Sequence, residues 1–111
     1  MKKQILKSDK FKKARGGYSR LLEIGCTKCG HAICLYQKDG PGILKRMYVD
    51  RMLRSDKLQN LTLKELPQLA CSSCKEHVGV PFIYKKENRL AYRLFVGSVA
   101  KKIVDSSKVK L

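Results

Sequence analysis

Two short cysteine pairs constrain the fold of this chain more than any other feature. The first pair is Cys26 and Cys29, the second is Cys71 and Cys74, and two residues separate the members of each pair. Such a spacer lets one tight turn present two sulfurs to the same ion, and a second turn of the same kind completes a tetrahedron. We therefore expect the four thiolates to bind one structural Zn²⁺. Residues 30–70 lie between the pairs, where about 15 to 20 residues are usual, so the segment between them is expected to carry structure and function of its own.

Competing uses of the cysteines fit the sequence less well. An odd count of five cysteines, with no signal peptide, disfavours a secreted disulfide framework. A thioredoxin-like dithiol requires its CxxC at the head of a helix, whereas residues 31–36 alternate like a strand. Cys34 is expected to be a small buried apolar residue. His31 and His77 are spare potential ligands, and His77 remains an alternative to a cysteine because sites with three cysteines and one histidine exist.

The residues around the cysteines also suit a metal. Four thiolates on Zn²⁺ leave a charge near −2, which Lys28 and Lys75 are placed to offset. Gly30, directly after the first pair, supplies the positive φ that such a turn often requires. Lys75 holds the corresponding position after the second pair, so the second turn is expected to be more strained or differently shaped.

Basic residues greatly outnumber acidic ones. The 111-residue chain, long enough for one domain, has 25 Lys and Arg against 9 Asp and Glu, a formal net charge of +16. A compact state with this charge repels itself unless a polyanion neutralises it, which predicts a nucleic-acid partner. A membrane surface is the rival polyanion, but the sequence has no apolar run near about 18 residues and no lipidation motif. Reduced thiols without a targeting segment predict the cytoplasm.

The charge pattern predicts three parts. Residues 1–20 form a basic arm, residues 21–104 a single domain with an insertion at 38–68, and residues 105–111 a basic tail. Tyr18 follows a Gly-rich stretch flanked by arginines, which can lie along a phosphate backbone while the ring stacks on a base. A solvated tail that only adds solubility is the alternative for the arm.

Short strands are expected to surround both cysteine turns, and helices are expected between them. Alternation predicts strands near residues 31–37, 78–84 and 90–96, the second at a sheet edge because Pro81 cannot donate to a ladder. In residues 43–54 the apolar positions lie close to helical spacing, although Tyr48 and Val49 also suit a β ribbon. Thr62 and Glu65 have the spacing of a capping box and predict a second short helix before Pro67. The expected class is therefore small α+β, with antiparallel hairpins and one or two short helices in the insertion.

A helix beginning after the Gly40-Pro41-Gly42 turn would aim its N–H groups at that turn, with Lys45 and Arg46 in its first turn. This combination would hold a phosphate. A plain turn followed by a solvated face is equally compatible, because no phosphate-loop consensus is present. Arg51 and its neighbour Asp50 could also form an exposed pair that contributes little.

With both turns, the strands after them and the basic flanks in place, the chain resembles a zinc ribbon, a fold group common in ribosomal and transcription proteins. The resemblance covers residues 21–37 and 69–92 and implies zinc bound by the four paired cysteines. Residues 40–51, with Gly-Pro-Gly, Leu-Lys-Arg, Tyr48 and Asp-Arg, are similar to short uncharacterised bacterial zinc-ribbon proteins, which implies no activity. The fold group itself does not fix the ligand, since it has many partners.

The expected function is that of a zinc-stabilised nucleic-acid-binding protein that docks on structured, ribosomal RNA through phosphate contacts, or on another RNA–protein particle. RNA is favoured over DNA because the charge is spread over both ends and no recognition helix is evident. The residues expected to contact nucleic acid are Lys12, Lys13, Arg15, Tyr18, Arg20, Lys45, Arg46, Arg51, Lys101 and Lys102. The alternative is a zinc-ribbon protein–protein adaptor in transcription or DNA-repair machinery. An enzyme with a small-molecule substrate is not expected, because four cysteines close the metal shell.

Overall fold

The computed structural model describes residues 19–40, 42–53 and 60–104. These residues form short strands and one 3₁₀ turn, which in chain order are β1 (Ser19–Cys26), β2 (Ala32–Asp39), β3 (Arg46–Tyr48), η1 (Val49–Arg51), β4 (Met52–Leu53), β5 (Leu69–Ala70), β6 (His77–Tyr84), β7 (Arg89–Leu94) and β8 (Val99–Val104). The arm at 1–18 and the tail at 105–111 lie outside the described residues.

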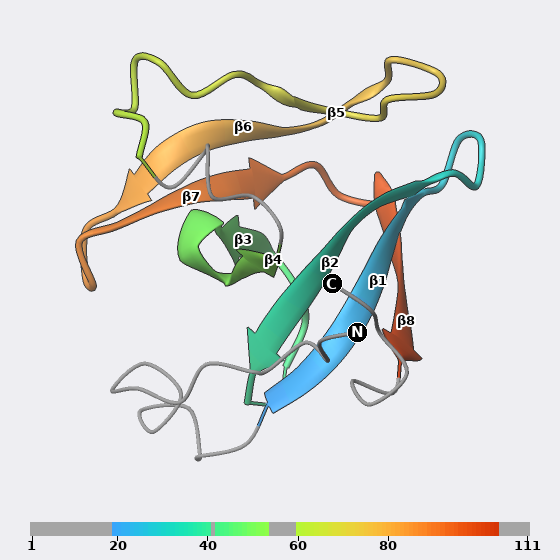
Figure 1. The fold of residues 1–111 in the computed structure, drawn as a ribbon, viewed down its shortest axis with the longest axis horizontal. Helices are drawn as coiled ribbons and strands as arrows, with labels where there is room; N and C mark the ends of the chain where they lie inside the picture. The colour runs from blue at the N-terminus through green and yellow to red at the C-terminus, as the bar shows by residue number, and fades with distance from the viewer. Residues whose placement is uncertain (1–18, 41, 54–59, 105–111) are drawn as a thin grey trace, which may run out of the picture.

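The strands form two antiparallel sheets of four strands each, with the orders β4-β2-β1-β8 and β3-β7-β6-β5. Figure 1 shows β6 and β7 crossing above the strands β1, β2 and β8 of the other sheet. Within the described ranges there is no α-helix. The expected α+β class is therefore wrong, and the described part of the chain is an all-β structure.

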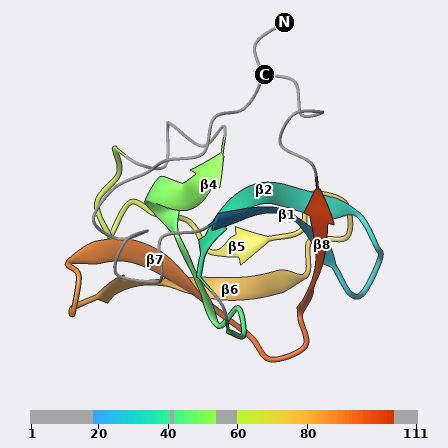
Figure 2. The same ribbon diagram turned by 90° about the horizontal axis from the view of Figure 1, so that it is seen from below.

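The chain passes repeatedly from one sheet to the other. The hairpin β1–β2 belongs to one sheet, β3 to the other, β4 to the first again, β5 to β7 to the second, and β8 returns to the edge of the first beside β1. Figure 2 shows β6 and β7 below β1 and β2, with β8 standing at the side of the molecule. Because the strands of each sheet are drawn from both halves of the chain, neither sheet can be completed without the other.

The core lies between the sheets, where alternate side chains of each strand point inward. From the first sheet it receives Leu22, Ile24 and Tyr36, and from the second Met47, Val78, Tyr92 and Leu94. Two buried tyrosine hydroxyls are hydrogen-bonded: the backbone N–H of Tyr48 donates to Tyr36 Oη (2.8 Å), and Tyr92 Oη donates to the Pro67 carbonyl (2.7 Å). The first bond ties β3 of one sheet to β2 of the other.

The expected helix at residues 43–54 is replaced by β3, η1 and β4. Met47, Tyr48 and Val49 are buried in succession, as are Met52 and Leu53. One face of a helix cannot bury three consecutive residues, whereas a segment crossing between two sheets can. The helix-like spacing arises because η1 turns the chain by about one turn between strands that belong to different sheets.

The expected helix after Thr62 is reduced to a single turn. One half of the capping box forms, since Thr62 N–H donates to Glu65 Oε1 (2.9 Å). Thr62 Oγ1 donates to the same oxygen (3.0 Å), and Glu65 N–H donates to the Thr62 carbonyl (3.1 Å). Leu66 N–H closes one helical turn on the Thr62 carbonyl (3.1 Å). Pro67 has no N–H to continue the ladder, so the chain extends towards β5 instead.

The strands expected from alternation are present, with shifted ends. The expected strand at 31–37 is β2, that at 78–84 is β6, and that at 90–96 is β7. The prediction that Pro81 lies at a sheet edge is correct at this position. β6 lies between β7 and β5, but β5 pairs only with His77 and Gly79, so among the described strands β6 has a neighbour on one side only at Pro81. β8 follows the bend at Gly97, whose φ is +74°. No helix in the described part of the chain is long and apolar enough to cross a membrane.

Candidate metal centre

Each cysteine pair lies in the turn of a β hairpin. The first turn joins β1 to β2. In it, Cys26 N–H donates to the His31 carbonyl (2.9 Å) and Gly30 N–H donates back to the Cys26 carbonyl (2.7 Å). Gly30 has a φ of +80°, in the left-handed region that a residue without Cβ enters freely. The sequence-based expectation for Gly30 is confirmed.

The second turn joins β5 to β6 and repeats the same hydrogen bonds. Cys71 N–H donates to the Glu76 carbonyl and Lys75 N–H donates to the Cys71 carbonyl, both at 2.9 Å. Lys75 has a φ of +67° and therefore holds the left-handed position that glycine holds in the first turn. Left-handed backbone costs an ordinary residue about 1 to 2 kcal/mol, so the second turn has the same shape with more strain.

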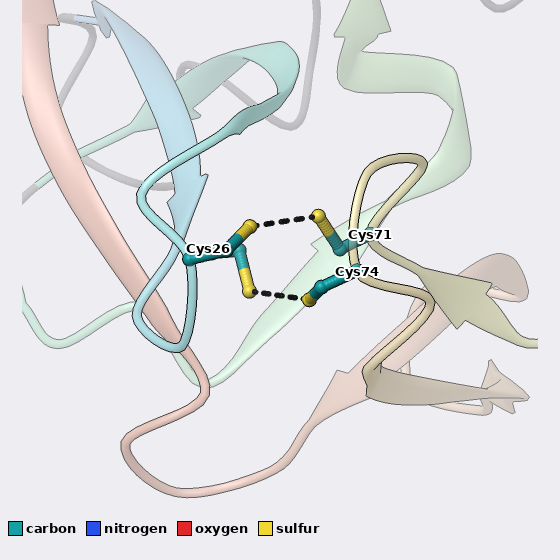
Figure 3. A group of neighbouring side chains, drawn as sticks. Cys26, Cys71 and Cys74 are labelled. Carbon is teal, nitrogen blue, oxygen red and sulfur yellow. Dashed lines mark hydrogen bonds between the residues drawn. The ribbon is translucent and has the colours of Figure 1, made fainter.

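The two turns face each other and bring the four predicted cysteines together. Their sulfur atoms all lie within 4.8 Å of one another. The shortest separations cross between the turns: Cys26 Sγ to Cys74 Sγ is 3.7 Å, and Cys29 Sγ to Cys71 Sγ is 3.5 Å. Figure 3 shows Cys26 on one turn pointing towards Cys71 and Cys74 on the other. A disulfide would need about 2.05 Å, so the five cysteines are free thiols.

These distances fit a tetrahedral metal ion. With metal–sulfur bonds of about 2.3 Å, the sulfurs of a tetrahedron are about 3.8 Å apart. The two short sulfur–sulfur distances between the turns are close to this value. The longest sulfur–sulfur distance in the cluster would have to shorten by about 1 Å for a metal to bind. The four cysteines could therefore hold one metal ion, and Cys26 and Cys71 are buried while Cys29 is exposed.

The thiols cannot all ionise side by side without a cation. The backbone N–H of Cys74, together with that of Ser73, lowers the pKa of the Cys71 thiol to about 6. The backbone N–H of Glu76 acts in the same direction on Cys74, but desolvation and the other three thiols raise the pKa of Cys74 to about 11. A bound divalent cation would remove this conflict, because it favours every thiolate at once.

The lysines near the turns make specific contacts. Lys28 Nζ lies 3.6 Å from Glu76 Oε2, an exposed pair that joins the two turns, and Lys75 Nζ donates to the Ser72 carbonyl (2.9 Å). Thr27 adds a link to the bend before β8, since its Oγ1 donates to the Gly97 carbonyl (2.7 Å). The centre therefore lies where the two hairpins and the β7–β8 connection meet.

The spare candidate ligands stay outside the cluster of sulfurs. His31 and His77 are exposed, and neither belongs to a metal-ligating group among the described residues. Cys34 packs against the core from β2, and burial raises the pKa of its thiol to about 12. Its expected role as a small apolar residue fits this position.

The residues predicted to contact nucleic acid are dispersed. Lys12, Lys13, Arg15 and Tyr18 lie outside the described residues. Arg20 is the second residue of β1, and its exposed side chain lines a pocket together with the exposed Lys101 of β8. Lys102, the next residue of β8, points to the opposite face. Lys45 is exposed before β3, and no helix begins there to support a phosphate at its N-terminus.

Arg51 does not belong to the basic surface. Its side chain is 1% exposed, and its Nε lies 3.0 Å from Asp39 Oδ2. Asp39 Oδ1 accepts from Ser19 Oγ (2.6 Å) and from Gln37 Nε2 (2.9 Å), so the ion pair belongs to a polar cluster at the ends of β1 and β2. The expected exposed pair between Arg51 and Asp50 is also absent, because Asp50 binds Arg89 instead (2.6 Å). Arg51 is a structural residue and is withdrawn as a nucleic-acid contact.

Sequence reasoning missed an arginine–aromatic surface on the second sheet. The Arg46 guanidinium lies 4.0 Å from the centre of the Tyr84 ring, and that of Arg93 lies 4.8 Å from the centre of the Phe82 ring. Strand register places these four residues on the face of the sheet opposite Met47 and the core. Alternation of side chains along β6 places Phe82 and Tyr84 on one face, and pairing with β7 places Arg93 on the same face. The sequence therefore contained this pattern.

No protein-family model, curated protein or solved structure gives a significant match to this chain. The conclusions on function therefore depend on the chemistry of the described residues.

Proposed function

We propose that this chain is a zinc-stabilised protein that binds nucleic acid, with structured RNA of a ribosome or another RNA–protein particle as its target. The observation that carries the proposal is the formal charge of +16. Such a charge disfavours the compact state unless a polyanion accompanies it. RNA supplies one negative charge per nucleotide and is bound largely through these phosphates.

Several of the described acidic residues support this reading because they are engaged within the protein. Asp39 pairs with Arg51, Asp50 and Glu87 both pair with Arg89, and Glu65 accepts from Thr62. The pairs involving Asp39 and Arg89 are largely buried. Carboxylates that are paired inside the protein are not available to neutralise the exposed lysines.

Zinc is the ion that best fits the cysteine cluster. Four cysteines in two CxxC turns are the usual ligand set of a structural zinc, and a shell of four thiolates leaves no open position for a substrate. The proposal is for a structural metal and a binding protein, not an enzyme. Because free thiols persist in reducing compartments, we place the protein in the cytoplasm.

The arginine–aromatic surface gives RNA a second kind of contact. Arg46 and Arg93 lie over aromatic rings on this face, where Arg93 is exposed and Arg46, Phe82 and Tyr84 are partly exposed. A base can stack on a guanidinium plane or on the ring beneath it, and such stacking contributes about 1 to 3 kcal/mol per base. This combination of phosphate and stacking contacts suits single-stranded or looped RNA better than a rigid duplex.

The test is the salt dependence of RNA binding by the full-length, zinc-loaded chain. If six to ten phosphates are engaged, the affinity for a labelled structured RNA should fall about 10³ to 10⁵-fold between 50 and 200 mM salt. Fluorescence anisotropy over this range measures the slope directly. A flat dependence, or no binding at 50 mM salt, would refute the proposal.

A zinc-ribbon adaptor between proteins is the second candidate, favoured by one observation. Phe95 and Val96 are exposed apolar residues in the turn between β7 and β8, next to the metal centre. Exposed apolar groups of this kind can dock on a protein partner. Affinity purification distinguishes the two: an RNA-dependent association is lost after nuclease treatment, whereas an adaptor complex survives it.

A further inference from the structure

A pocket of about 470 Å³ opens on the first sheet, lined by residues of β1, β2 and β8 and by the glycine turn after β2. Three of its lining residues are cations: Arg20, Lys38 and Lys101. Its two β1 residues, Arg20 and Leu22, lie roughly 14 to 20 Å along the strand from Cys26, at about 3.4 Å per residue, and none of the cysteines lines it. The pocket is therefore distinct from the metal centre.

The pocket gathers like charges from three strands. Arg20 of β1 and Lys38 of β2 are direct cross-strand partners. Like charges directly opposite one another on neighbouring strands are unfavourable. Lys101 adds a third cation from β8, and no carboxylate is among the described residues that line the pocket. Three cations lining one pocket would attract a bound anion.

The glycine turn completes the pocket and holds one of the cations in place. Lys38 Nζ donates to the Gly40 carbonyl at 2.7 Å, which anchors the ammonium group at the wall. Gly40 and Gly42 have φ values of +73° and +110°, and no heavy atom lies within 4 Å of the place that a Cβ would take at Gly42. The backbone at Gly42 is therefore open to close approach by a ligand.

The remaining wall is apolar. Leu22 is 2% exposed and forms part of the core, whereas Ile103 is 60% exposed. The two are direct partners across β1 and β8, so Ile103 supplies most of the accessible apolar surface beside the cations and Leu22 lies behind it. A simple inorganic anion would interact only with the cations. A ligand with a flat apolar part and a negatively charged group would contact both the apolar surface and the cations.

We propose that this pocket binds one nucleotide of an RNA strand, with the phosphate on Arg20, Lys38 and Lys101 and the base against Leu22 and Ile103. Its volume is within the roughly 300 to 1,000 Å³ typical of small-ligand sites. The inference rests on the proposed function and adds a defined site to it. The pocket gives one nucleotide a fixed position, while phosphate contacts elsewhere add affinity without regard to position.

The test compares two double variants of the full-length, zinc-loaded chain. Arg20→Gln with Lys101→Gln removes two pocket cations. Lys86→Gln with Lys102→Gln removes two exposed cations elsewhere, and Lys102 is a close match because it follows Lys101 on β8 but faces away from the pocket. Circular dichroism and zinc content check that both variants fold. Binding is measured by anisotropy with a labelled 12-nucleotide single-stranded RNA, and by NMR titration with 5′-AMP and with inorganic phosphate.

We expect the pocket variant to lose about tenfold more RNA affinity than the control, because charge-assisted hydrogen bonds are stronger than general attraction. We also expect AMP, more than phosphate, to shift the amide signals of Leu22 and Ile103. Equal losses in both variants, or no AMP shifts at these two residues, would overturn the pocket and leave RNA binding by the wild type standing. If the wild type binds no RNA, the proposed function is refuted, and so is an RNA strand as the ligand of the pocket. The AMP titration would then still show whether the pocket binds a nucleotide.

Discussion

Replacing Asp39 with Asn removes a full negative charge from a buried ion pair while keeping the shape of the side chain. The side chains of Arg51 and Asp39 are 1% and 4% exposed, and they meet at 3.0 Å. Removing one partner of a buried pair costs about 3 to 5 kcal/mol, because the other charge stays desolvated. The new amide still has one acceptor oxygen for Ser19 or Gln37, so the loss should come mainly from the charge. We expect the free energy of unfolding to fall by about 3 to 5 kcal/mol, a large part of the stability of a small domain.

The chain offers a matched control in Asp50→Asn. Asp50 also binds an arginine, at 2.6 Å, but its side chain is 37% exposed, and Arg89 has a second carboxylate partner in Glu87 at 3.0 Å. Because Arg89 keeps Glu87 as a partner and the Asp50 carboxylate is partly solvated, neutralising Asp50 should cost only about 1 kcal/mol. Urea unfolding of both variants at one fixed excess of zinc, followed by circular dichroism, measures the difference. Equal losses in the two variants, or a loss below about 1 kcal/mol for Asp39→Asn, would refute the assignment of Arg51 as a buried structural residue.

Four further predictions concern the metal centre, a close backbone contact and the fifth thiol. Chelation, or Cys71→Ser, should unfold the described sheets, because a structural zinc contributes about 10 to 16 kcal/mol of binding free energy. The β signal in circular dichroism should disappear in excess chelator, and a retained signal would contradict the role of the metal. Since the pKa of Cys74 is raised to about 11, its proton must leave on binding, so the zinc affinity measured with a competing indicator should rise at least about 100-fold from pH 6 to pH 8; a constant affinity would contradict the thiolate assignment. Gly79→Ala should destabilise the protein by about 1 to 3 kcal/mol, because a Cβ there would lie 2.9 Å from the Arg93 carbonyl oxygen. Gly25→Ala, whose Cβ would lie at an ordinary 3.6 Å from the His31 carbonyl oxygen, is the comparison in urea unfolding, and equal losses in the two variants would contradict the crowding at Gly79. Cys34, whose pKa is raised to about 12 by burial, should stay unalkylated by iodoacetamide at pH 8 in zinc-loaded protein, and rapid modification found by mass spectrometry would place it at the surface.

The cysteine site could be predicted from the sequence because its geometry is local. A two-residue spacer fixes the shape of each turn, and the position after the second cysteine must be left-handed in both. Gly30 shows this requirement in the sequence. Lys75 hides it, and only the repeated hydrogen bonds reveal that the second turn has the same shape.

The segment between the cysteine pairs could not be predicted in the same way, because its structure depends on distant partners. Met47 and Met52 point into one core from strands of different sheets, which imitates the periodicity of a helix. Arg51 has an acidic neighbour in Asp50, yet its partner is Asp39, twelve residues away. Composition identified the basic character of the chain, but only the register of β1, β2 and β8 shows that Arg20, Lys38 and Lys101 converge.

The interleaving of the two sheets has a consequence for how the protein is made. As the chain leaves the ribosome, β1 emerges early, but its neighbour β8 is the last described strand to be synthesised. The first two thiols likewise wait for Cys71 and Cys74 before a metal can be enclosed. Contacts between distant parts of a chain form slowly, so the nascent polypeptide must remain open and reduced through most of its synthesis. Metal supply at the moment of release would then set how much of it reaches the native state.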